Sequence, residues 1–282
     1  MNRRIAEEKF FLGLMLLSML IVLGSLLSVF VTVFLRGVSA LSLSMVTQTP
    51  KGGYYLGKEG GVLNAIVGSL YLASGATALS FVFSLPIALY LYEYAGGGRG
   101  TSYIRRSLDV LAGIPSIVFG AFAFTLMIYF GARASLLWGI VTVSLFLMPM
   151  MTRAIDEVLL ATPVHLRETS FALGSTRFEY ISRVVIRQAL PGILSAVLIS
   201  FGRAFGDAAA VLLTAGYTDN IPSALSDPVA TLPLAVFFQV ATPIPEVQQR
   251  AYASGIILLF IILTLSIISR LASKRLMSYV VR

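Results

Sequence analysis

The sequence predicts an all-helical integral membrane protein with about six transmembrane helices. Of the 282 residues, 57% are hydrophobic and only 12% are charged. Soluble domains are about half apolar and about a quarter charged, so this composition favours a lipid environment. A helix needs about 20 apolar residues to cross the hydrocarbon core of a bilayer. Suitable apolar stretches occupy 10–35, 62–92, 107–130, 135–152, 192–216 and 251–269.

The first apolar stretch is interpreted as a retained helix rather than a cleaved signal peptide. Basic residues precede it, but 10–35 is much longer than the roughly 7–15 apolar residues of a signal peptide. No convincing small-residue cleavage pattern precedes Arg36. We expect the chain to divide into this helix with its outer loop (1–61), a transmembrane core (62–275) and a cytoplasmic tail (276–282).

The positions of the basic residues predict that both termini lie in the cytoplasm. With the N-terminus inside, fifteen of the 21 Lys and Arg residues fall in inner segments and five in outer segments. The remaining one, Arg203, lies within a span. An excess of Lys and Arg in inner loops is the bias that orients membrane proteins. The net charge of +8 is therefore explained by orientation, and no nucleic-acid partner is expected.

The outer segment 217–250 contains a second apolar run, at 231–240. A helix of this length reaches only about 15 Å, roughly half of the hydrocarbon core. Prolines on both sides of the run would interrupt a longer helix. A re-entrant or interfacial piece is the favoured interpretation, and a partly buried surface loop is the alternative.

Catalytic, metal and cofactor sites are poorly supported. The chain has no cysteine and a single histidine, His165, so neither a thiolate site nor a paired-histidine zinc site can form. Gly52, Gly57 and Lys58 have the spacing of a phosphate-binding loop, but Glu59 replaces the hydroxyl residue that would hold magnesium. We therefore expect that the chain is not an enzyme and that it binds no ATP, metal or other cofactor itself.

Arg203 and Asp207 are the candidate substrate-pathway residues. Both lie inside the fifth apolar stretch, where an ionised side chain costs at least about 2.5–3.5 kcal/mol and must face protein or water. Four residues apart on a helix, the two side chains would share one face and could meet. Small neighbours such as Gly202 and Gly206 would leave room for a partner helix or a passage.

The functional interpretation of this pair is a pathway for an anion. The guanidinium of Arg203 would transiently donate two parallel N–H hydrogen bonds to a tetrahedral oxyanion, and Asp207 would hold Arg203 in place. Asp207 could also accept the proton of a hydrogen phosphate, which fully ionised sulfate lacks. The structural alternative is an internal ion pair that only orients the helix.

A long charged loop, 153–191, is predicted to form short amphipathic helices on the cytoplasmic side. Acidic and basic residues recur in it at helical intervals, and Gly174 breaks the pattern. Such a loop is typical of a docking surface for a cytoplasmic partner, although a solvated face would have the same pattern.

Within this loop the sequence resembles the cytoplasmic signature of ABC importer permeases, which is Glu-Ala-Ala, three residues and then Gly. The matching residues are Glu168-Thr169-Ser170-Phe171-Ala172-Leu173-Gly174. Thr169 and Ser170 depart from the two alanines but remain small. In that family the segment forms coupling helices that fit a groove on the ATPase subunit. The resemblance implies an ATPase-coupling role for Arg167, Glu168, Thr169, Ser170 and Gly174.

Four further segments look like the PstA-type subunits of phosphate-specific importers. They are Ile114 to Gly120, Arg153 to Gly174, Arg203 to Asp207, and Thr231 to Leu234 followed by Ala251. Two positions depart from the pattern, because Asp207 stands where that group has Glu and Arg187 where these permeases often have proline.

The resemblance implies the type I ABC importer permease fold, with six transmembrane helices and cytoplasmic coupling helices, in the cell membrane. The function it implies is import of inorganic phosphate. A PstC-type permease would complete a heterodimer with the anion pathway between the two subunits. Two cytoplasmic ATPase subunits would hydrolyse ATP, and an extracytoplasmic phosphate-binding protein would deliver the substrate.

Several alternatives compete with this interpretation. Arg203 alone does not distinguish phosphate from sulfate or molybdate, and the chain could fill the PstC-type role. An ion-coupled secondary transporter would usually show inverted repeats, and no convincing one is present. An intramembrane enzyme would need paired catalytic groups at membrane depth, which Arg203 and Asp207 do not provide.

Overall fold

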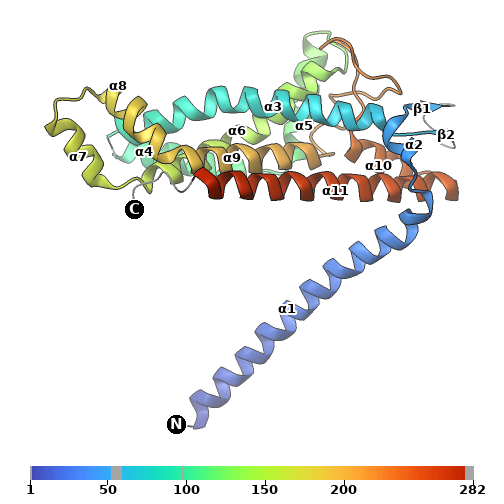
Figure 1. Ribbon diagram of the computed structural model, residues 1–282, viewed down its shortest axis with the longest axis horizontal. Coiled ribbons are helices and arrows are strands. Elements are labelled where there is room, and N and C mark those ends of the chain that lie inside the picture. The colour runs from blue at the N-terminus through green and yellow to red at the C-terminus, as the bar shows by residue number, and fades with distance from the viewer. Residues whose placement is uncertain (1, 52–58, 97, 277–282) are drawn as a thin grey trace.

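The computed structural model describes residues 2–51, 59–96 and 98–276, and helices dominate it (Figure 1). The helices are α1 (Asn2–Gly37), α2 (Leu43–Thr47), α3 (Leu63–Leu89), α4 (Arg99–Ala112), α5 (Ser116–Tyr129), α6 (Leu136–Leu160), α7 (Val164–Ala172), α8 (Arg177–Glu179), α9 (Ile186–Gly206), α10 (Leu232–Val240) and α11 (Pro245–Leu276). A 3-10 turn (Val38–Ala40) follows α1, and π-helical turns follow α3 (Tyr90–Tyr94) and precede α9 (Tyr180–Val185). Within the described residues, one short antiparallel pair, β1 (Pro50–Lys51) and β2 (Glu59–Gly60), is the only sheet.

The prediction of a helical membrane protein is confirmed. Five helical segments are long and apolar enough to cross a membrane, at 7–40, 63–94, 136–160, 177–206 and 245–271. A sixth crossing exists if α4 and α5 are counted as one span, although a bend of 93° separates them. The predicted cytoplasmic tail (276–282) lies outside the described residues apart from Leu276. Residues 52–58, which contain the glycines and lysine with the spacing of a phosphate-binding loop, also lie outside them.

The predicted continuous helix at 107–130 is wrong. α4 ends at Ala112, and α5 begins at Ser116 with Pro115 immediately before it. A proline ring disfavours helical backbone at the preceding residue, so α4 does not continue through Ile114. Apolar residues run through the break, which explains why hydropathy alone joins the two helices.

Close packing of α3 on α6 forms the centre of the bundle. The face of α3 that meets α6 carries small residues, and Gly75 lies against the side chain of Ile140. The hydroxyl of Ser84 donates to the carbonyl of Met148 at 3.1 Å. Small residues let two helices approach closely in a membrane, where lipid gives little hydrophobic driving force between them. The α3–α6 pair therefore forms the central contact around which the other helices of the bundle pack.

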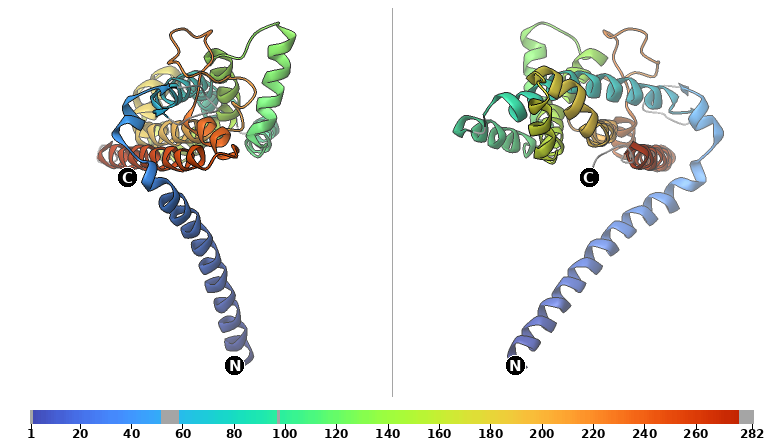
Figure 2. Two further views of the ribbon diagram at one scale, coloured as in Figure 1. Left: turned by 90° about the vertical axis from the view of Figure 1, so that its right-hand side faces the viewer. Right: turned by 60° about the vertical axis from the view of Figure 1, so that its left-hand side comes forward.

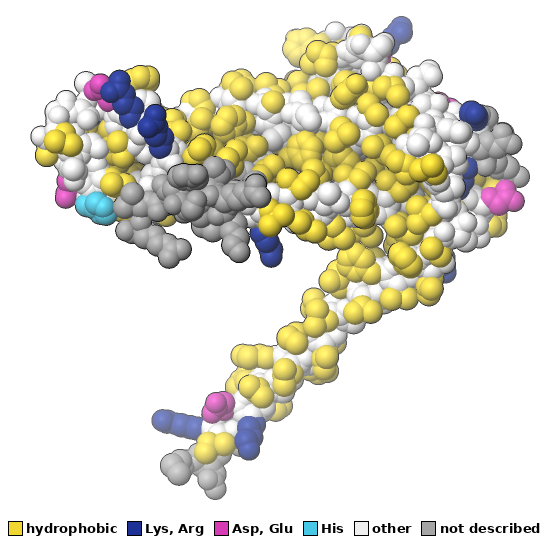
Figure 3. All heavy atoms as spheres, viewed as in Figure 1, with side chains coloured by type: hydrophobic (Ala, Val, Ile, Leu, Met, Phe, Trp, Pro, Cys, Tyr) yellow, Lys and Arg dark blue, Asp and Glu magenta, His cyan; other side chains and the backbone are white. Residues whose placement is uncertain are grey.

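The N-terminal helix α1 projects away from the bundle (Figures 1 and 2). No residue in its most apolar stretch is buried, and hydrophobic side chains cover its visible face (Figure 3). Its C-terminal end contacts α11, where Gly37 lies against the backbone of Tyr252 and Ala253. The apolar surface of α1 is therefore left to lipid or to another subunit.

The run at 231–240 forms a separate short helix, α10, and its first turn is buried. Leu232 and Leu234 have no exposed surface, and α10 packs against α11. The side chain of Thr231 accepts a hydrogen bond from the backbone N–H of Leu234 and caps the helix. This geometry fits an inserted segment better than a surface loop.

Gly68 of α3 shows how tightly the segment before α10 is held. A Cβ at this position would overlap the backbone carbonyl of Ala230. We expect Gly68→Ala to lower the free energy of unfolding by about 2 kcal/mol, because backbone must shift to relieve the overlap. Thermal unfolding of the purified protein in detergent measures this effect. Gly24→Ala, where nothing lies within 4 Å, is the matched control, and equal unfolding of the two variants would contradict the prediction.

Candidate functional site

Arg203 lies in the last turn of α9 and is exposed on the surface of this subunit. Its guanidinium carbon is 4.9 Å from the ring centroid of Phe146 in α6. Phe146 is buried and meets Phe119 of α5 edge to face, with 5.9 Å between ring centroids. A cation over an aromatic face gains a favourable electrostatic contact. Phe146 therefore stabilises the guanidinium, and Phe119 packs against Phe146.

The depth of Arg203 follows from this contact. Phe146 lies near the middle of α6, a helix that is long enough to cross the membrane. A charge at that depth must face protein or water, because lipid offers no hydrogen-bond partner. The exposed surface around Arg203 therefore requires a second protein surface or a water-filled route beside it.

Asp207 does not pair with Arg203, contrary to the expectation from their spacing. No ion pair within 4.0 Å joins the two side chains, both of which are described. Asp207 follows α9 with extended backbone angles (φ −83°, ψ 124°), and its Oδ1 accepts a hydrogen bond of 2.8 Å from the N–H of Ala210. Side chains four residues apart share one face only if both residues lie in the same helix. α9 ends at Gly206, one residue before Asp207. Asp207 instead caps the turn that follows.

The backbone after Asp207 is non-helical although the sequence is apolar. Residues 209–215 form turns, and Ala210, Val211, Thr214 and Ala215 are fully buried. The hydroxyl of Thr142 donates to that of Thr214 at 3.2 Å and ties the turns to α6. Irregular backbone at membrane depth is tolerated where protein surrounds it or where it lines a cavity. The predicted span 192–216 is thus a helix up to Gly206 and a buried turn segment after it.

The sequence-predicted coupling residues lie together on and just after α7. Glu168 and Thr169 are exposed, whereas Ser170 is buried and its hydroxyl donates to the carbonyl of Leu166 at 2.7 Å. Gly174 has a φ of +82°, a backbone conformation that side chains other than glycine rarely adopt. The glycine of the signature therefore ends α7 and reverses the chain towards α8.

Arg167 pairs with a buried carboxylate of the bundle although its own side chain is 45% exposed. Its Nη2 and Nε donate to the two carboxylate oxygens of Glu93, at 2.9 and 3.2 Å, and Glu93 lies in the π-helical turn after α3. The hydrogen bonds from Arg167 to the Glu93 carboxylate raise the pKa of the Arg167 guanidinium. Arg167 therefore fixes α7 to the bundle, while part of its side chain remains exposed.

Large apolar side chains surround the exposed residues of α7. Val164 is 70% exposed, Leu173 82% and Phe178 74%. α7 and α8 project together from one end of the bundle, where Figure 3 shows charged and hydrophobic side chains mixed (Figures 1 and 3). Exposed apolar side chains grouped within a charged surface are typical of a protein-binding site.

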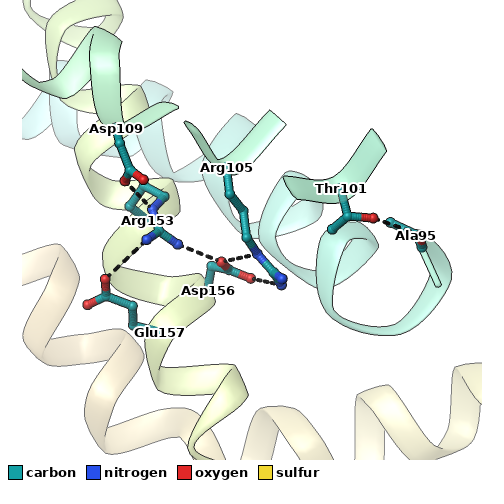
Figure 4. A network of polar contacts seen from close by, with 7 residues as sticks. All are labelled: Ala95, Thr101, Arg105, Asp109, Arg153, Asp156 and Glu157. Atoms are coloured by element: carbon teal, nitrogen blue, oxygen red, sulfur yellow. Dashed lines mark hydrogen bonds and ion pairs between the residues drawn. The ribbon is translucent and has the colours of Figure 1, made fainter. Parts of the chain in front are cut away.

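A network of charged side chains that the sequence analysis missed joins α4 to α6 (Figure 4). The carboxylate of Asp156 is fully buried and accepts two hydrogen bonds from Arg105, at 2.8 and 2.9 Å. Arg153 donates to the same carboxylate at 2.9 Å and to Asp109 at 2.5 Å. Residues 153–160 belong to α6, so this part of the predicted docking loop is the end of a long helix and not a loop. Arg153 and Asp156, three residues apart beside an apolar stretch, were the available signal for a paired buried charge.

The described residues contain no group of three histidine, aspartate or glutamate side chains placed to hold a metal ion. His165, the only histidine, lies exposed on α7.

Comparison with known proteins identifies the class of this chain. Residues 84–278 match the family described as binding-protein-dependent transport system inner membrane component, and the chain belongs to this family of membrane transport permeases. It is 31% identical to the phosphate transport system permease protein PstA of Haemophilus influenzae, over 95% of this chain and 94% of that protein. It is 35% identical to phosphate transport system permease protein PstA 1 of Mycobacterium tuberculosis, over 74% of this chain and 69% of that protein.

Solved structures show the same fold. The chain superposes on a subunit of a bacterial alginate ABC transporter with a TM-score of 0.68 and 13% identity, over 95% of this chain and 96% of that one. A methionine ABC transporter in an inward-facing conformation gives a TM-score of 0.63 and 19% identity, over 76% of this chain and 95% of that one. The predicted ABC importer permease fold is confirmed. Such permeases work with separate ATPase and substrate-binding subunits, so the chain is a transport component and not an enzyme.

Proposed function

We propose that this chain is a transmembrane subunit of an ATP-driven importer that moves inorganic phosphate into the cytoplasm. The observation that carries the proposal is the exposed guanidinium of Arg203 at membrane depth, in a chain that is similar to PstA permeases over most of its length. A guanidinium offers paired N–H donors that match the oxygens of a tetrahedral oxyanion. One such group binds an anion weakly enough to release it, as transport requires.

The uncovered surface around Arg203 supports a second permease subunit as partner. The guanidinium lies over the ring of Phe146, which packs against Phe119 of α5, and the neighbouring residues Val118 and Phe122 of α5 are exposed. A similar subunit facing this surface would enclose Arg203 in a path between the two chains. In this proposal the partner is a PstC-type permease, and an extracytoplasmic phosphate-binding protein delivers the anion.

The surface of α7 supports docking of cytoplasmic ATPase subunits, one on each permease. Glu168 and Thr169 are exposed there beside Leu173 and Phe178. In this arrangement the end of the bundle that carries α7 faces the cytoplasm. α11 ends at the same end of the bundle (Figure 1), so the C-terminus would also be cytoplasmic. The excess of Lys and Arg in the inner segments favours the same orientation for the N-terminus.

Reconstitution tests the proposal directly. The chain is purified with its partner subunits, placed in proteoliposomes that contain ATP, and supplied with the phosphate-loaded binding protein outside. We expect radiolabelled phosphate to accumulate inside, with unlabelled phosphate competing and sulfate or molybdate not competing. Uptake that persists without the ATPase subunits would identify an ion-coupled transporter instead, and competition by sulfate or molybdate would identify a different oxyanion.

The docking role of α7 predicts that Glu168→Ala combined with Gly174→Ala uncouples ATP hydrolysis from transport. Alanine at Gly174 is strained by the φ of +82°, and removing the Glu168 carboxylate deletes an exposed polar contact. We expect phosphate uptake per ATP hydrolysed to fall about tenfold. Gly131→Ala is the matched control, because Gly131 has a φ of +64° and open space but lies between α5 and α6. An unchanged uptake ratio in the double variant would remove the docking assignment.

A further inference from the structure

The π-helical turn Tyr90–Tyr94 ends α3 with an unusual set of side chains. Glu93 carries a charge in this turn, yet its side chain is only 1% exposed. A buried carboxylate is retained only where a cation and hydrogen bonds compensate the loss of water. Arg167 of α7 provides both, through the two-pronged contact described above.

The two residues beside Glu93 also contact the segment that carries α7 and α8. The hydroxyls of Tyr92 and Tyr180 lie 3.1 Å apart, and Tyr180 is completely buried. The guanidinium carbon of Arg177 is 6.0 Å from the ring centroid of Tyr94. Three successive residues of this turn therefore each contact a different residue of the segment 167–180. π-helical turns of this kind recur at functional positions in helices.

Contacts within the segment make it a single unit. The guanidinium of Arg167 lies 5.0 Å from the ring centroid of Phe171, and that ring lies 5.5 Å from the ring of Tyr180. The side chain of Thr176 accepts from the N–H of Glu179 while the Glu179 carboxylate accepts from the N–H of Thr176, so a capping box begins α8. These contacts connect α7 and α8 to each other and to the Tyr92–Tyr94 turn.

We propose that Glu93 is a positioning residue, which fixes α7 to the end of α3 so that both move as one body. This inference rests on the proposed docking of an ATPase subunit on α7. From α3 the displacement passes to α6 through their close packing, and α6 carries Phe146 beneath Arg203. The Glu93–Arg167 pair thus joins the docking surface to the anion site through contacts within this one chain.

The first test measures coupling in the assembled transporter. Glu93→Gln keeps the shape of the side chain and removes its charge, and Arg167 is 45% exposed, so water can solvate the released guanidinium. We expect ATP hydrolysis to continue and uptake per ATP to fall about tenfold. The exchanged pair Glu93→Arg with Arg167→Glu should recover part of the loss. Arg183→Gln removes an exposed ion pair of the same segment, and it should leave the ratio unchanged.

The second test measures the connection itself and does not depend on ATPase docking. The chain has no cysteine, so Phe83→Cys on α3 and His165→Cys on α7, both exposed, accept spin labels selectively. We expect a narrow distribution of label–label distances in the assembled transporter and a distribution at least twice as wide after Glu93→Gln. An unchanged width, or unchanged uptake per ATP, overturns the inference.

A separate measurement distinguishes failure of this inference from failure of the proposed function. Leu173→Cys, 82% exposed beside α7, should crosslink to an ATPase subunit in the assembled transporter. Absence of that crosslink would count against the docking proposal, while the label distances would still report whether Glu93 holds α7. Presence of the crosslink with an unchanged label width would remove only the role of Glu93.

Discussion

Replacing Arg203 with alanine should lower phosphate uptake about a hundredfold while the transporter still assembles. A two-pronged charge-assisted contact is worth about 3 kcal/mol, which corresponds to this factor. The guanidinium rests on the surface of Phe146 and engages no ion pair among the described residues, so its removal leaves no buried charge behind. Uptake into proteoliposomes measures the effect, and size-exclusion chromatography of the purified complex checks assembly.

Two further variants show whether phosphate uptake depends on the paired N–H donors of the guanidinium or only on its positive charge. Arg203→Lys retains the charge but loses the planar paired donors, and we expect it to keep only a small part of the activity. Arg133→Ala removes an exposed cation from the turn before α6, and it should transport normally. Normal uptake by the Arg203→Ala variant would show that this arginine has only a structural role.

Replacing Asp156 with asparagine should lower the free energy of unfolding by about 3 kcal/mol. Its carboxylate has no exposed surface and accepts hydrogen bonds from both Arg105 and Arg153. The neutral variant leaves two guanidinium groups, which are 24% and 21% exposed, close together without the negative charge that compensates their repulsion. Breaking a buried ion pair by removing one partner typically costs about 3–5 kcal/mol, and the partial exposure of the arginines places this site at the lower end.

Chemical unfolding of the detergent-solubilised protein measures this change. Glu157→Gln is the matched control, because Glu157 is the next residue on α6 and is 68% exposed. We expect the control to change the unfolding free energy by less than about 0.5 kcal/mol. Equal stability of the two variants would show that the α4–α6 network does not hold the two helices together.

Composition and the positions of apolar stretches were enough to predict a helical membrane protein and the place of most of its spans. They failed where local backbone chemistry overrides hydropathy. Pro115 stops α4 inside a continuously apolar stretch, and Asp207 ends α9 by capping the next turn. A window that averages hydropathy cannot register either event, because each depends on one residue.

The sequence supports the candidate site only as a hypothesis. The spacing from Glu168 to Gly174 predicts a coupling segment, and the charge of Arg203 within an apolar stretch predicts a pathway residue. The direction of each charged side chain was not predictable. Arg167 and Asp156 pair with partners far away in the sequence, Glu93 and Arg105, which lie next to them in the fold. Such pairs depend on tertiary packing, and helical spacing within one segment contains no information about them.

The separation of Arg203 from Asp207 has an electrical consequence for the proposed route. Since Asp207 caps the following turn, its carboxylate forms no ion pair with Arg203, and no described residue supplies a carboxylate within 4.0 Å of the guanidinium. Sodium or potassium ions would meet a barrier there, whereas a dehydrated anion would regain part of the solvation that it gave up on entry. The proposed route would then discriminate between ions by the sign of their charge before it discriminates between anions by shape.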